Sequence, residues 1–228
     1  MMGLEVRQPL RINNKIKLVS FLEETTLYLY YRNINKNKMI NLSKKKVVGF
    51  GSAKIAYAID DEKVILCSKR RNDEHIRAEW EMIQYLERFG LPTIHDVKIA
   101  PISNTKTGSS LGLLQKYVTK SKLFKPNGDG PILLSQINQN VLRKMHQTLL
   151  EHKIYIDDLQ FLYNEEELYI IDPSNVYHIE NKYHVGHDKP RNQHAVLEIK
   201  YINQMRNIQK LIDFNLLHGS FIKLKKNK

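Results

Sequence analysis

The chain has 228 residues, of which 42% are apolar and 26% charged, which is ordinary for one globular domain or two small lobes. No apolar run is long enough to cross a membrane, and residues 1–15 lack the layout of a signal peptide. The single cysteine, Cys67, excludes an internal disulfide. Together these features predict a protein of a reducing compartment, with the cytoplasm as the default location.

The formal net charge is +12, which favours an acidic partner or simply a well-solvated surface. The basic clusters at 44–46, 68–71 and 223–228 are not interleaved with aromatic residues. No helix-turn-helix or zinc-finger spacing occurs either. Binding of nucleic acid is therefore a minor hypothesis.

After a mixed segment at 1–46, the sequence predicts five strands and one helix. The helix, at 74–89, has apolar residues at helical spacing and ends at Gly90. The strands are short apolar runs between turn residues, at 47–51, 54–60, 63–69, 94–100 and 111–118. Downstream we predict a helix at 134–152, a strand hairpin from 159 to 172, a long helix at 190–214 and a basic tail.

The turn Gly49-Phe50-Gly51-Ser52 follows the first of these strands. Glycine has no Cβ, so backbone N–H groups in such a turn can approach a phosphate, although an ordinary hairpin also uses glycine. Lys69 ends the third strand, 69 − 49 = 20 residues after Gly49, and is the expected phosphate ligand. Lys54, just past the turn, is a second lysine able to reach phosphate or to clamp the turn.

The predicted helix at 74–89 offers a carboxylate to pair with that lysine. Glu79 shares a face with Met82, Ile83 and Leu86, which are three, four and seven residues further on. This face should pack on the sheet, so we expect Glu79 to point at Lys69. Glu81 is the alternative.

Three further acidic residues surround the predicted hairpin. Asp157 and Asp158 follow the second helix among apolar residues and lead into a strand. Asp172 ends the next strand, 172 − 157 = 15 residues later, and the hairpin should return it to their side. Adjacent carboxylates and an Asp-Pro pair are also common in exposed turns.

In order and element type, these features resemble the protein-kinase signature. The resemblance implies an α+β, bilobal kinase-like fold with a five-stranded antiparallel sheet plus one helix in its first lobe. The implied parts are an extension at 1–46, an ATP-binding lobe at 47–118, a reduced helical lobe at 119–215 and a basic tail at 216–228. The third glycine of the signature is absent, since Lys54 stands there.

The same resemblance implies roles for particular residues. ATP would contact Lys69 and the residues Gly49, Phe50, Gly51, Ser52, Gln115 and Tyr117. Asp157 or Asp158 would accept the proton of the acceptor hydroxyl. Motif alignment selects Asp158, while the shortened loop favours Asp157, so we treat them as a pair. Asp172 would bind Mg²⁺, with Mn²⁺ as an alternative, and Gln160 would replace the metal-binding asparagine.

Only 228 − 172 = 56 residues follow Asp172, and no Ala-Pro-Glu ends an activation segment. With the stretch I-I-D-P-S-N-V-Y at 170–177, this resembles the small effector kinases that bacterial type III secretion systems inject, of the OspG, NleH and HopBF kinds. The resemblance implies a Ser/Thr protein kinase acting on a host protein in the host cytosol. It also implies an activating host partner, for which the basic surface favours an acidic one.

Two other functions remain open from the residues. A pseudokinase would keep the fold and bind nucleotide or a partner without phosphoryl transfer. The departures from the kinase signature in the glycine turn and catalytic loop favour it. A small-molecule phosphotransferase usually has a larger helical half, and a kinase-like fold can also transfer an adenylyl group.

Overall fold

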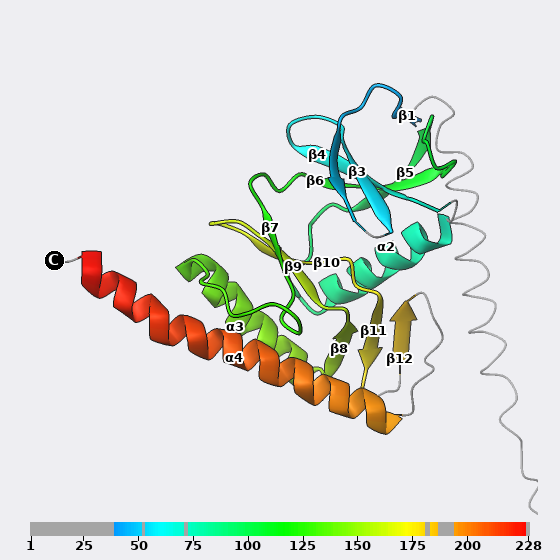
Figure 1. Cartoon of the computed structure of the whole chain (residues 1–228). Helices are drawn as coiled ribbons and strands as arrows, with labels where there is room; N and C mark the ends of the chain where they lie inside the picture. Colours follow the sequence, from blue (N-terminus) through cyan, green and yellow to red (C-terminus); the bar gives the residue numbers. More distant parts are fainter. Residues whose placement is uncertain (1–38, 52, 71–72, 181–182, 187–193, 227–228) are drawn as a thin grey trace, which may run out of the picture. The chain divides into compact units, whose positions relative to one another are not determined.

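The computed structural model describes residues 39–226 apart from 52, 71–72, 181–182 and 187–193 (Figure 1). The chain divides into two units, Met1–Ile40 and Asn41–Lys228, and nearly all of the first lies outside the described residues. Strands and helices both contribute to the second unit, which confirms the α+β class. The expected boundaries after residues 46, 118 and 215 stay predictions.

The largest sheet has six strands rather than the expected five. Its spatial order is β1 (Ile40–Asn41), β5 (Lys98–Ser103), β6 (Leu111–Lys116), β4 (Lys63–Ser68), β3 (Lys54–Ala58) and β2 (Val47–Phe50). The neighbouring pairs from β5 to β2 are antiparallel. The extra strand, β1, has two residues in a polar stretch, too short for a two-residue alternation to reveal it.

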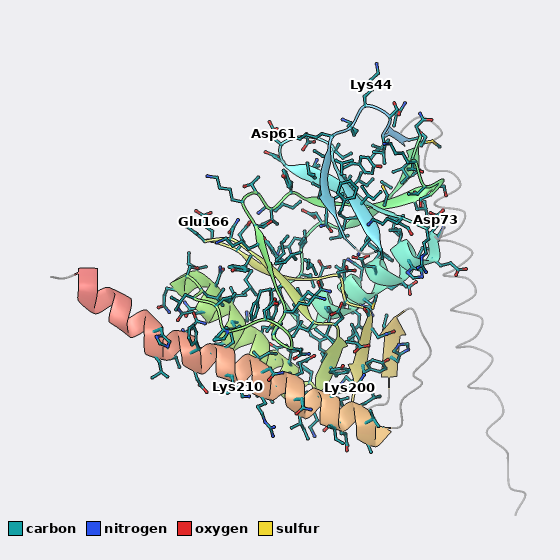
Figure 2. The ribbon with its side chains drawn as sticks, in the orientation of Figure 1. Lys44, Asp61, Asp73, Glu166, Lys200 and Lys210 are labelled. Atoms are coloured by element: carbon teal, nitrogen blue, oxygen red, sulfur yellow. The ribbon has the colours of Figure 1, made fainter. Side chains whose placement is uncertain are left out.

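Helix α2 (Asp73–Arg88) follows β4, as the spacing of its apolar residues predicted. Its N-terminus is tied to β6, because the Asp73 carboxylate accepts hydrogen bonds from the backbone N–H groups of Ser110 and Leu111, each at 3.2 Å (Figure 2). The helix ends before Gly90, whose φ of 68° lies in the left-handed region that glycine adopts readily. The start of α2 is thereby fixed against the sheet.

The remaining chain forms two three-stranded sheets and two helices. One sheet has the order β10 (Leu168–Ile171), β9 (Gln160–Tyr163) and β7 (Lys122–Phe124). The other has the order β12 (Tyr183–Gly186), β11 (Asn175–His178) and β8 (Ile154–Asp157). The helices are α3 (Gln136–Glu151) and α4 (His194–Lys226), which lie side by side (Figure 1). The hairpin β9–β10 was predicted, whereas β7, β8, β11 and β12 were not.

One apolar core cluster joins α2, α3 and α4 with strands β7, β8, β9, β10 and β11. Helix α4 also contributes a buried polar contact, because Gln204 accepts a hydrogen bond from the backbone N–H of Ile156 in β8 at 3.0 Å. Strand β8 ends at Asp157, and Asp158 follows directly. The hydrogen bond to Gln204 therefore attaches the strand before these two aspartates to α4. No helix among the described residues is long and apolar enough to cross a membrane.

We expect Gln204→Leu to lower the free energy of unfolding by about 1–3 kcal/mol, because the buried N–H of Ile156 loses its acceptor. Urea denaturation measures the difference. Asn203→Leu, at an exposed position of the same helix turn, is the control and should change stability by less than about 0.5 kcal/mol. Equal effects of the two substitutions would contradict the role of this hydrogen bond.

Candidate functional site

Lys54 joins two carboxylates from distant parts of the chain. Its Nζ lies 2.5 Å from Glu79 Oε2 in α2 and 2.6 Å from Asp172 Oδ1, just past β10. Lys54 begins β3, directly after the glycine turn, whose Gly51 N–H donates to the Lys54 carbonyl at 2.9 Å. We call Lys54, Glu79 and Asp172 the Lys54 cluster.

The three side chains differ in exposure. Those of Lys54 and Glu79 are 13% and 5% exposed, and that of Asp172 is 42% exposed. Burial lowers the pKa of Lys54, but the two carboxylates outweigh it and raise that pKa above its ordinary value. Burial raises the pKa of Glu79, which the Lys54 ammonium opposes. The lysine is therefore charged at neutral pH, and Asp172 is the member of the cluster that reaches solvent.

The backbone at Asp172 directs its carboxylate toward Lys54. Its φ of 49° is uncommon for a residue other than glycine. In the β9–β10 hairpin Ile171 pairs with Gln160, so Asp172 leaves the sheet beside the start of β9. The Ser174 N–H then donates to the Asp157 carbonyl at 3.2 Å, which ties this turn to β8. The hairpin thus returns Asp172 to the side of the Asp157–Asp158 pair.

The expectation that Glu79 would point at Lys69 is wrong, because the cation beside Glu79 is Lys54. Ser68 lies opposite Lys54 in the β3–β4 pairing, so these two side chains share one face of the sheet. Lys69 is one residue further on, and a shift of one residue moves a side chain to the other face. Its Nζ instead donates to the Gly51 carbonyl at 2.5 Å and lies 5.8 Å from the Phe50 ring centroid.

The alternation of side chains between the two faces of a strand is the sequence signal that could have identified Lys54. Lys54, Ala56 and Ala58 alternate along one face of β3. Two small residues beside a lysine leave open space on that face.

Asp157 and Asp158 are adjacent in sequence but have different partners. Asp157 accepts a hydrogen bond from the Tyr155 hydroxyl at 2.8 Å, and Lys200 Nζ lies 3.9 Å from its Oδ1. Lys200 belongs to α4 and is labelled in Figure 2. Burial and this carboxylate raise the pKa of Tyr155 above its ordinary value. Asp158, with a φ of 53°, turns away from β8.

The carboxylate of Asp158 lies in a small polar group. Lys125 Nζ is 3.0 Å from its Oδ1, and the Gln160 amide donates to its Oδ2 at 2.6 Å. Gln160 is buried at the start of β9 and, through its amide nitrogen, holds the carboxylate. The structure therefore brings Asp158 and Gln160 together, as neighbours of the Asp172 turn.

The remaining predicted nucleotide-binding residues lie along the same sheet. Gly49 pairs with Ala56, and Phe50, 73% exposed, ends β2. Gln115 lies opposite Val64, which in turn lies opposite Ala58, so Gln115 is on the Lys54 face. The Tyr117 N–H, just past β6, donates to the Glu62 carbonyl at 2.6 Å. Ser52 lies outside the described residues.

A surface pocket of about 560 Å³ lies elsewhere, between the end of α2 and α3. It shares no residue with the Lys54 cluster and is lined by Glu87, Gly90, Leu91, Pro92, His95, Asp96, Val141, Lys144 and Met145. We place the candidate site at the Lys54 cluster, where a buried lysine contacts two carboxylates.

The described residues contain no group of three or more His, Cys, Asp or Glu side chains that could hold a metal ion. A magnesium ion bound together with nucleotide phosphates needs only one or two carboxylates. Asp172, whose side chain is 42% exposed and lies beside the Lys54 ammonium, fits that requirement. The amide nitrogen of Gln160 donates to Asp158, so Gln160 would bind a metal ion through its carbonyl oxygen.

No protein-family model and no curated protein matches the chain. Among solved structures, one named SAICAR synthase is similar, with a TM-score of 0.36 and 13% sequence identity. The match covers 77% of this chain and 93% of the other.

We expect Lys54→Met to lower the free energy of unfolding by about 3–5 kcal/mol at pH 8, because Glu79 is then a buried charge without its cation. The loss should be smaller at pH 5. Without Lys54 the raised pKa of Glu79 makes the folded state bind a proton that the unfolded state releases, so stability falls as pH rises.

Urea denaturation at pH 5 and pH 8 measures both effects. Lys69→Met is the matched control, since that side chain is exposed, and should cost less than about 1 kcal/mol at either pH. Adding Glu79→Leu to Lys54→Met should recover much of the loss. A pH-independent loss in Lys54→Met would contradict the buried ion pair.

Proposed function

We propose that this chain is an ATP- and Mg²⁺-dependent phosphotransferase of the protein-kinase-like kind. The observation that carries the proposal is the Lys54 cluster, in which one lysine from the glycine turn bridges a helix carboxylate and a strand-end aspartate. A lysine held by a helix glutamate beside a metal-binding aspartate is the arrangement that protein kinases use for the nucleotide phosphates. Here the lysine comes from the strand directly after the glycine turn, β3, whereas the kinase signature places it at the end of the next strand, which is β4 in this chain.

In this proposal Lys54 binds the nucleotide phosphates and Glu79 orients Lys54. A bound Mg²⁺ would neutralise the negative charge of the nucleotide phosphates. Asp172 would hold it, since its carboxylate is the exposed member of the cluster. Gly49 and Gly51 let the turn approach the phosphates, and Lys69 positions that turn through the Gly51 carbonyl.

We assign the proton-accepting role to Asp158 rather than Asp157. The Asp157 carboxylate is engaged by the Tyr155 hydroxyl, on the side of β8 that faces α4. The Asp158 side chain, 47% exposed, lies beside Gln160, which pairs with the residue before Asp172. Asp158 is therefore the carboxylate that an acceptor hydroxyl can reach from the Lys54 side.

We further propose that the acceptor is a Ser or Thr hydroxyl of a protein. The support is the resemblance of the motifs to small effector kinases, with a host protein as substrate in the host cytosol. The net charge of +12 favours an activating partner with an acidic surface. Nucleotide binding without transfer, by a pseudokinase, is the alternative outcome of the test below.

Incubation with ATP and Mg²⁺ followed by intact-mass analysis, with and without a generic protein acceptor, tests the proposal. We expect the mass gain of one phosphate on the chain or the acceptor. Lys54→Met and Asp172→Ala should abolish it, and Asp158→Asn should lower the rate by about 10²–10⁴-fold, as expected for a lost base. Asp157→Asn is the matched control and should have the smaller effect.

A mass gain of one adenylyl group would show that the chain transfers a nucleotidyl group rather than a phosphoryl group. A thermal shift with ATP but no mass gain would select the pseudokinase. Equal labelling of wild type and Asp172→Ala would refute the site.

The position of the lysine allows a rescue experiment. Ser68 lies opposite Lys54 on the same face, so a lysine there should reach Glu79. Lys54→Ala should weaken ATP binding by about 10–100-fold, the value of a charge-assisted hydrogen bond. Adding Ser68→Lys should recover about tenfold of this loss.

Isothermal titration with ATP and Mg²⁺ measures the recovery. Lys69 is unchanged in the Lys54→Ala variant and serves as the internal control, since it lies one residue beyond Ser68 and on the other face of the sheet. Full ATP affinity in the Lys54→Ala single variant would show that Lys54 is not the phosphate ligand.

A further inference from the structure

The turn between β8 and β9 consists of Asp158 and Leu159 and has no cationic side chain. Leu159 is buried in the core. A base that receives a hydroxyl proton works beside a phosphoryl group whose negative charge must be stabilised during transfer. The cation next to Asp158 must therefore come from another part of the chain.

Lys125 is the lysine that contacts Asp158. Its Nζ lies 3.0 Å from Oδ1 and 3.4 Å from Oδ2 of that carboxylate. Lys200 approaches Asp157 instead, on the α4 side of β8. The two basic side chains are thus divided between two adjacent carboxylates.

The backbone at Lys125 is held from both sides. Strand β7 pairs with β9 so that Phe124 lies opposite Phe161, and their rings stack with centroids 6.3 Å apart. After the strand, the Lys125 N–H donates to Asp129 Oδ2 at 2.7 Å, and the Lys125 carbonyl accepts from the N–H groups of Gly128 and Asp129. The backbone of Lys125 is therefore held in place beside the start of β9.

Its head group, in contrast, remains adjustable. The side chains of Lys125 and Asp158 are each 47% exposed, and an ion pair at that exposure contributes little to stability. An ammonium group has three N–H donors, so Lys125 can keep one on Asp158 and turn another toward a phosphoryl oxygen.

We propose that Lys125 is a catalytic residue that links Asp158 to the phosphoryl group in transfer. This rests on the proposed function and deepens it. The acceptor hydroxyl oxygen bonds to the γ-phosphorus, and the bond from that phosphorus to the β–γ bridging oxygen breaks, its electron pair leaving with ADP. The hydroxyl proton passes to the Asp158 carboxylate. Lys125 neutralises the phosphoryl oxygens on the side opposite Lys54.

The test compares Lys125→Met with Lys125→Arg and with Lys122→Met, a substitution at an exposed lysine of β7, the strand that Lys125 follows. Phosphoryl transfer from ATP is measured with and without casein as acceptor, and the affinity for ATP by titration. We expect Lys125→Met to lower kcat by about 10²-fold, as for loss of a donor to the transition state, with ATP affinity within about twofold of wild type. Lys125→Arg should retain most of the rate and Lys122→Met all of it.

A second readout does not depend on turnover. ADP with Mg²⁺ and aluminium fluoride imitates the phosphoryl group in transfer, and its retention reports transition-state binding. Lys125→Met should weaken retention of the aluminium fluoride complex by about 10²-fold and leave the affinity for ADP unchanged. A merely structural role would lower the melting temperature and both affinities together, and that result would overturn the proposal.

The failures of the two proposals are distinguishable. If wild type transfers phosphate and Lys125→Met does so at the same rate, the role of Lys125 is refuted and the proposed function stands. If wild type neither transfers phosphate nor retains the aluminium fluoride complex, both are refuted.

Discussion

The ion pair between Lys54 and Glu79 is the interaction on which the candidate site depends. It joins the first residue of β3 to the buried face of α2, and Asp172 attaches the end of β10 to the same ammonium. Breaking one partner of a buried pair is costly, because the other remains as an uncompensated charge. A single side chain therefore contacts the sheet, the helix and the end of the hairpin, at the place that we propose for phosphate binding.

The cluster is also asymmetric, and this suits it to bind a cation and an anion together. Glu79 is enclosed and keeps Lys54 charged and oriented, while Asp172 reaches solvent. A metal ion can take Asp172 without removing the buried partner of the lysine. The left-handed backbone at Asp172 requires the turn to be held in place, which the hydrogen bond from Ser174 to Asp157 provides.

The sequence was sufficient for the features set by local periodicity. The helix α2 with its buried Glu79, the β9–β10 hairpin and the strands β2, β3, β4 and β6 follow from apolar spacing and turn residues. The choice between Lys69 and Lys54 did not follow from these patterns, because the two side chains lie on opposite faces of the sheet. Strands such as β7 and β11 were also missed, since each has three or four residues and depends on pairing with distant segments.

The adjacent aspartates show why the finer assignment needs three dimensions. Along β8 successive side chains point to opposite faces, so Asp157 turns to Tyr155 and α4 while the chain after it leaves the strand. Asp158 then meets Lys125, which lies 158 − 125 = 33 residues away, and Gln160. Two identical carboxylates thereby acquire different environments, which is the condition for one to act on substrate and the other to support structure. Because the turn between β8 and β9 is so short, the partners of Asp158 have to come from β9 and from the loop after β7. The pairing of β7 with β9 therefore sets the surroundings of the Asp158 carboxylate.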